Sequence, residues 1–60
     1  MGTYTYTTDG NSFYTPTPYE IIKDQLLTER GRYIEVPGSE GNNYMVNVNN
    51  ISCIEQELSN

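Results

Sequence analysis

Few residues of this chain could do chemistry: it has carboxylates, one lysine, one cysteine and several hydroxyls, but no histidine. Glu55 and Glu57 alternate along a predicted strand and therefore share a face, where they could act as an acid–base pair or bind a divalent ion. Paired glutamates on an acidic surface strand are more often solvated charges that discourage strand addition. We therefore predict no catalytic residue, no metal site and no cofactor, and a protein that is not an enzyme.

Cys53 is the single cysteine, so the chain forms neither an internal disulfide nor a Cys/His zinc site. It lies between Ile51 and Ile54 with no basic residue nearby in the sequence to lower its pKa, which predicts a small core residue rather than an activated thiol. An unpaired cysteine suits a reducing compartment, and the N-terminus has neither a basic segment nor an apolar run. We expect a cytoplasmic protein without a membrane span.

Six tyrosines in sixty residues are the most unusual feature of the composition. Tyrosine combines rigid apolar area with a polar tip, which suits protein interfaces and also stacking on a nucleotide base. We expect core roles for Tyr33 and Tyr44. Interface and core roles are both open for the other four, and our interface candidates are Tyr4, Tyr6, Tyr14, Tyr19, Glu55 and Glu57.

The charge balance is acidic, with eight carboxylates against Lys23, Arg30 and Arg32 and a net charge of −5. Direct nucleic-acid binding is not expected, because that affinity comes mainly from basic residues that neutralise phosphates. An acidic chain can instead dock on a basic surface of another protein. Alternatively, the scattered charges only keep a small protein soluble.

The elements that must position these residues begin with an alternation of Thr and Tyr from Thr3 to Thr8. Asp9-Gly10-Asn11 predicts a turn, after which Ser12 to Thr15 can return as a partner strand. Tyr4 and Tyr6 would share one face, with Phe13 or Tyr14 able to meet them. The alternative for residues 1–16 is a mobile arm.

A helix with its C-terminal cap is predicted over residues 17–31. Thr17 and Glu20 form a capping-box pattern, Pro18 occupies the first turn, and Gly31 follows Arg30 as a left-handed cap. The helix should run from Pro18 to Glu29 or Arg30. Its apolar stripe consists of Tyr19, Ile22 and Leu26, flanked by Ile21 and Leu27.

Residues 32–58 are predicted to form a hairpin and a final short strand. Arg32 to Val36 is the first strand, with Tyr33 and Glu35 on one side, and a connection over residues 38–43 leads to the strand that begins at Tyr44. Asn49-Asn50 offers a bend before the last strand, Ser52 to Gln56. We expect most of the core from this segment: Tyr44, Met45, Val46, Val48, Ile51, Ile54 and Leu58.

Together these elements predict one small α+β domain over residues 1–60. The expected architecture is a small antiparallel sheet with one helix, in the approximate order β-β-α-β-β-β. A core of this size only marginally offsets the conformational entropy of folding, so we expect a homodimer to complete it.

In length, acidity, Tyr/Asn-rich composition and lack of catalytic residues, the whole chain resembles the small acidic proteins with which bacteriophages neutralise host or defence enzymes. That group includes the compact homodimeric Hachiman anti-defence proteins. The resemblance transfers no individual functional residue. It implies a phage or mobile-element inhibitor that binds a host or defence protein in the host cytoplasm and blocks it by steric occlusion.

Two other functions remain open. A dimer cleft lined by Tyr and Asn could bind or sequester a nucleotide, although three basic residues argue against a highly phosphorylated ligand. Alternatively, the chain could be a structural assembly subunit whose exposed strands add to neighbouring copies.

Overall fold

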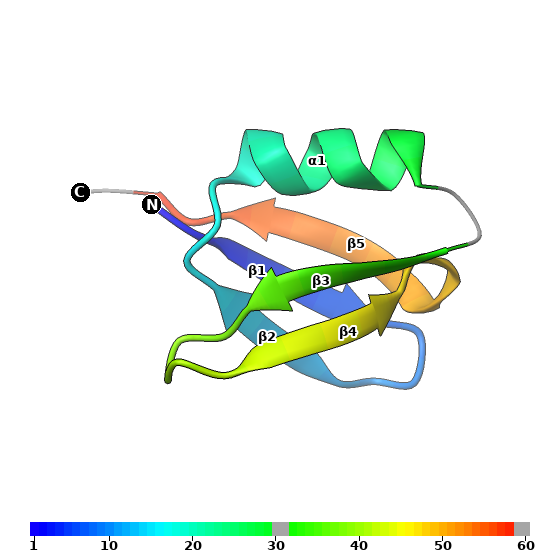
Figure 1. Cartoon of the computed structure of the whole chain (residues 1–60), viewed down its shortest axis with the longest axis horizontal. Coiled ribbons are helices and arrows are strands. Elements are labelled where there is room, and N and C mark those ends of the chain that lie inside the picture. Colours follow the sequence, from blue (N-terminus) through cyan, green and yellow to red (C-terminus); the bar gives the residue numbers. More distant parts are fainter. Residues whose placement is uncertain (30–31, 59–60) are drawn as a thin grey trace.

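The structure is a computed structural model that describes residues 1–29 and 32–58. Within these residues, one α-helix and five strands confirm the predicted α+β class and element order (Figure 1). The strands divide between a three-stranded sheet, β2-β1-β5, and a two-stranded sheet, β3-β4. The elements are β1 (Thr3–Thr7), β2 (Ser12–Thr15), α1 (Tyr19–Thr28), β3 (Tyr33–Pro37), β4 (Asn43–Asn47), the 3₁₀ helix η1 (Val48–Asn50) and β5 (Ile51–Gln56).

The first two strands form an antiparallel hairpin, which is the first of the two alternatives for the N-terminal residues. Gly10 supplies the positive φ of 89° that the turn needs. Because side chains alternate along a strand, Thr3 and Thr5 point inward and are fully buried, while Tyr4 and Tyr6 point outward. Opposite Tyr4 lies Tyr14.

The bend predicted at the two asparagines is the short helix η1, in which the Asn47 side chain accepts a hydrogen bond from the Asn49 N–H at 3.0 Å. This winding lets the chain turn from β4 into β5, which pairs antiparallel with β1. The first and last strands of the chain are therefore neighbours. Residues far apart in the sequence meet on this sheet.

The helix α1 buries its predicted stripe through Ile22, whose exposure is 1%, and through the half-buried Leu26. Ile21 is 52% exposed, and Leu27 is likewise exposed. Both flanks of the stripe therefore remain at the surface. The predicted positions of Arg30 and Gly31 at the end of the helix lie outside the described residues.

The predicted capping box is wrong. The N-cap is Pro18, and no side chain makes a capping hydrogen bond. The Thr17 carbonyl instead accepts a hydrogen bond from the Thr3 hydroxyl at 2.8 Å, and the Thr17 N–H donates to the Thr15 hydroxyl at 3.2 Å. Buried hydroxyls need hydrogen-bond partners, and the backbone of Thr17 provides them for Thr3 and Thr15. The turn before the helix therefore stabilises the strand threonines and does not cap the helix.

The core lies where α1 and the β3–β4 sheet meet the inner face of the three-stranded sheet. Its buried apolar side chains are Ile22, Ile34, Val36 and Val46, with Phe13, Leu26, Val48, Ile51 and Ile54 packed against them. In Figure 1 the strands β3 and β4 lie in front of β1 and β2, and α1 lies above β5. Ile34 and Val36 point inward as the alternation of β3 predicts.

Several predicted core residues are at the surface. Met45 is 64% exposed and Leu58 is 76% exposed, while Tyr33 is 60% exposed on the outer side of β3. Tyr44 is also exposed, although its ring lies 5.0 Å from that of Phe13. The outer side of the β3–β4 sheet has no covering layer in the described part of the chain, so only the inward-pointing half of each strand joins the core.

Candidate protein-binding face

The outer side of the three-stranded sheet gathers nearly all the predicted interface residues. We define the tyrosine–glutamate face as Tyr4, Tyr6, Tyr14, Cys53, Glu55 and Glu57. The register aligns Tyr14, Tyr4 and Glu55 across adjacent strands, and it places Tyr6 opposite Cys53. Glu57 follows directly after β5 and joins this face through its hydrogen bond to Tyr14.

Two tyrosine hydroxyls on this face are fixed by carboxylates. Tyr6 Oη donates to Glu55 Oε1 at 2.9 Å, and Tyr14 Oη donates to Glu57 Oε1 at 2.6 Å. Each hydrogen bond stabilises the neutral phenol and so raises the pKa of that tyrosine above 10.0. The tyrosines therefore act as donors that hold the glutamates in place.

Tyr4 adds an aromatic surface to this network. Its ring centroid lies 5.2 Å from that of Tyr14, with the ring planes tilted by 58°. This arrangement is within the range favoured for aromatic pairs, which adds rigidity to the centre of the sheet. Tyr4 is 40% exposed, so part of its ring remains available to a partner.

Glu57 also joins the two ends of the described chain through hydrogen bonds to Gly2. Its Oε1 accepts a hydrogen bond from the Gly2 N–H at 2.7 Å, and its own N–H donates to the Gly2 carbonyl at 3.0 Å. The hydrogen bond from Gly2, followed by that from Tyr14, lowers the pKa of the Glu57 carboxyl below its ordinary value. Glu57 is therefore ionised at neutral pH.

Only glycine fits at position 2 when these hydrogen bonds with Glu57 are formed. A Cβ at this position would overlap the Thr15 carbonyl oxygen and the Tyr14 hydroxyl. Any side chain would therefore push the start of the chain away from β2 and disturb the hydrogen bond between Tyr14 and Glu57.

The face is negatively charged, because it carries Glu55 and Glu57 while its strands contain no lysine or arginine. Lys23 lies on α1, where its Nζ is 3.8 Å from Glu20 Oε1 on the same helix. Glu55 accepts a hydrogen bond from Tyr6, and Glu57 accepts hydrogen bonds from Gly2 and Tyr14. The positive charge of the N-terminus makes a smaller contribution to the lowered pKa of Glu57. The charges of Glu55 and Glu57 are available to a positively charged partner.

Tyr19 and Cys53 lie in different parts of the structure. Tyr19 is half-buried on α1 and does not belong to the strands that form this face, so the structure does not group it with the other candidates. Cys53 is exposed, and its predicted core position is wrong. It lies opposite Tyr6, two residues before Glu55, and side chains two residues apart on a strand point to the same face. This alternation could have placed Cys53 beside Glu55, but the neighbouring isoleucines suggested a core position.

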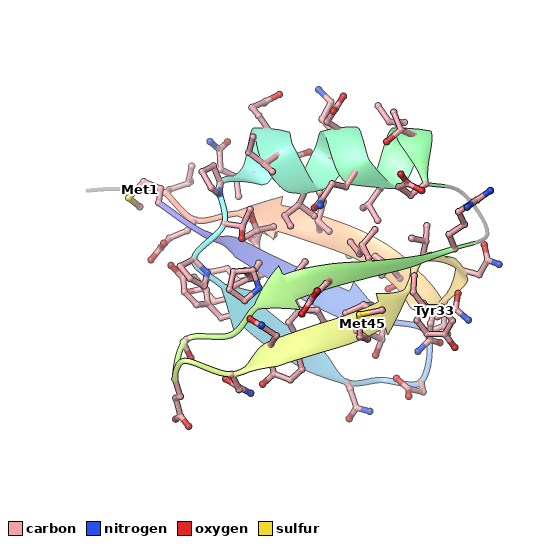
Figure 2. All side chains as sticks on the ribbon, in the orientation of Figure 1. Met1, Tyr33 and Met45 are labelled. Atoms are coloured by element: carbon pink, nitrogen blue, oxygen red, sulfur yellow. The ribbon has the colours of Figure 1, made fainter. Side chains whose placement is uncertain are left out.

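A second exposed region, which the sequence analysis missed, lies on the β3–β4 sheet. Figure 2 shows Tyr33 and Met45 close to each other on its outer side, toward one end of the hairpin. The register explains this, since Met45 pairs with Glu35 and is a diagonal neighbour of Tyr33. The sequence analysis missed this region because it assigned both Tyr33 and Met45 to the core.

Within residues 1–29 and 32–58, there is no pocket and no group of three or more potential metal-binding side chains. Across the same ranges, no helix combines the length and the apolar character that a bilayer span requires. No protein-family model, curated protein or solved structure gives a significant match to this chain.

Proposed function

We propose that the protein is a non-enzymatic binding module whose tyrosine–glutamate face docks on a basic surface of a larger protein. The observation that carries this proposal is the set of hydrogen bonds that fixes the half-buried Tyr6 and Tyr14 to Glu55 and Glu57 beside the partly exposed ring of Tyr4. Side chains already held in place lose little conformational entropy on binding. Tyrosine is also among the residues that contribute most to binding energy at protein interfaces.

The biological setting we propose is inhibition of a host or defence protein by a phage or mobile-element product. The resemblance in size, acidity and composition to phage anti-defence proteins supports it. Steric occlusion requires only a stable complex that covers a working surface of the target. A basic surface, including one that binds nucleic acid, is the kind of target that an acidic face selects.

Affinity capture from a host lysate tests the proposed function. The tagged protein should retain a stoichiometric protein partner at low salt and lose it as the salt concentration rises, because exposed charges are screened. Tyr4→Ser should lose this partner. Tyr33→Ser is the matched control, since it removes an exposed tyrosine from the other sheet and should retain the partner.

Circular dichroism of both variants would show that they remain folded. Absence of any stoichiometric partner would count against a protein-binding function. Equal retention by the Tyr4 and Tyr33 variants would show that the face is wrongly assigned.

A further inference from the structure

The tyrosine–glutamate face pairs aromatic rings with carboxylates on neighbouring strands. Tyr4 lies between Tyr14 on one side and Glu55 on the other. Directly opposite residues in a sheet have Cβ atoms about 4.5–5.5 Å apart. One flat group from a partner could therefore contact a ring and a carboxylate at the same time.

The hydrogen bonds within the face leave acceptor capacity for such a group. In the described part of the chain, the internal hydrogen bonds of Glu55 and Glu57 all arrive at Oε1. Oε2 of each carboxylate remains available as an acceptor. A donor from a partner can bind there without breaking the bonds that hold the glutamates in place.

Charge decides which kind of partner fits. A second copy that docked through the same face would bring together the glutamates of both copies, and none of the strands involved carries a basic residue. Nucleic acid would be repelled for the same reason. A cationic protein surface is complementary, because it neutralises Glu55 and Glu57.

Geometry decides between the two basic side chains. A guanidinium is planar, stacks on aromatic rings, offers several donors in a fixed arrangement and is more weakly hydrated than an ammonium group. The face lies on the open side of a sheet, and the described part of the chain has no pocket to enclose a compact lysine ammonium. Stacking on an open ring beside a carboxylate therefore favours arginine.

Building on the proposed function, we infer that the face recognises arginine side chains, presented by an arginine-rich segment or an arginine-lined surface of the partner protein. One guanidinium stacks on Tyr4 and pairs with Glu55. A second pairs with Glu57 beside the Tyr14 ring.

Calorimetric titration of the full chain with two homopeptides of equal length, one of arginine and one of lysine, tests this inference. We expect the arginine peptide to bind about threefold to tenfold more tightly than the lysine peptide, the difference that stacking on an exposed ring provides. Tyr4→Leu should remove this preference, and Glu55→Gln should weaken binding of both peptides. The controls Tyr33→Leu and Glu35→Gln alter exposed residues of β3 and should leave both affinities unchanged.

Cys53 provides a second measurement that needs no substitution, since it is exposed on the same face. The arginine peptide should slow alkylation of the Cys53 thiol. Equal affinity for the two peptides, equal effects of the Tyr4 and Tyr33 substitutions, or unchanged alkylation in the presence of saturating peptide would overturn the assignment to arginine.

Competition separates this inference from the proposed function. The arginine peptide should displace a partner captured from lysate, whereas the lysine peptide should do so less well. A partner that depends on Tyr4 but resists the arginine peptide would overturn the arginine assignment and leave the protein-binding function in place. An arginine peptide that binds as expected, when lysate yields no partner, would support the recognition chemistry and contradict the proposed function.

Discussion

Glu57 is the side chain on which several distant contacts of the three-stranded sheet converge. It accepts hydrogen bonds from Gly2 and Tyr14, and both stabilise its ionised form and lower its pKa. A carboxyl whose pKa is lower in the folded state contributes stability above its unfolded pKa, and loses that contribution as the pH falls through the folded value. The stability of the protein should therefore decrease below pH 4.5, the ordinary value for this carboxyl.

The substitution Glu57→Gln should flatten this acid dependence and reduce stability at neutral pH, because the amide accepts weaker hydrogen bonds than the carboxylate. Urea denaturation at a series of pH values between neutrality and acid measures both effects. Asp9→Asn is a suitable control: the pKa of Asp9 is also lowered, chiefly by the Thr7 hydroxyl, so this variant should keep the part of the acid dependence that belongs to Glu57. An acid dependence identical in Glu57→Gln and the unsubstituted protein would contradict this role.

Tyr6 provides a prediction at alkaline pH. The hydrogen bond to Glu55, followed by desolvation, raises the pKa of the Tyr6 hydroxyl above 10.0. Stability from this bond is fully present below pH 10.0 and is lost as the pH rises through the folded pKa. Glu55→Gln should lower the pKa of Tyr6, which phenolate absorbance can follow. Glu35→Gln, on the other sheet, should leave the phenolate titration unchanged, and the same curve for both variants would disprove the link between Tyr6 and Glu55.

At the scale of elements, α1 stabilises the fold through one face. Ile22 is 1% exposed and contacts the core, whereas Ile21 is 52% exposed. Ile22→Ala should reduce the free energy of unfolding by about 2–5 kcal/mol, and Ile22→Val by about 0.5–1.5 kcal/mol. Ile21→Ala should change it by no more than about 0.5 kcal/mol. Urea denaturation of the three variants measures the difference, and similar losses from Ile21→Ala and Ile22→Ala would show that the helix packs differently.

Strand periodicity predicted much of this architecture. The alternation of β1 places Tyr4 and Tyr6 on one face, and that of β3 places Ile34 and Val36 on the inside. The same rule could not say which side of a strand would be covered. Met45 is apolar but points away from the core, because only one side of the β3–β4 sheet meets another layer.

Other features depended on contacts between distant segments. Thr17 has the sequence context of a helix cap, yet its backbone hydrogen-bonds with two buried hydroxyls instead. One belongs to Thr3, fourteen residues away, and the other to Thr15, two residues away. The contact between Tyr14 and Glu57 likewise requires the pairing of β1 with both β2 and β5. Residue types suggested the members of the face, but only the sheet register brings them together.

For the whole molecule, the two sheets present outer surfaces of different character. The three-stranded sheet carries the tyrosine–glutamate face, and the two-stranded sheet exposes Tyr33 and Met45. Between them lies a core with few fully buried apolar side chains. A small core leaves little surplus stability, which is the physical reason for the expected homodimer. The homodimer stays a prediction.

The charge of the tyrosine–glutamate face restricts how such a dimer could form. Contact between two copies of this face would juxtapose carboxylates on strands that carry no lysine or arginine, so we expect a dimer to leave the face open. Sedimentation at increasing protein concentration should then show a dimer mass, while the alkylation rate of Cys53 stays the same across that range. A monomer mass at every concentration would contradict dimerisation. A dimer in which Cys53 becomes protected would instead place the second copy on the face that we assign to an arginine-bearing partner.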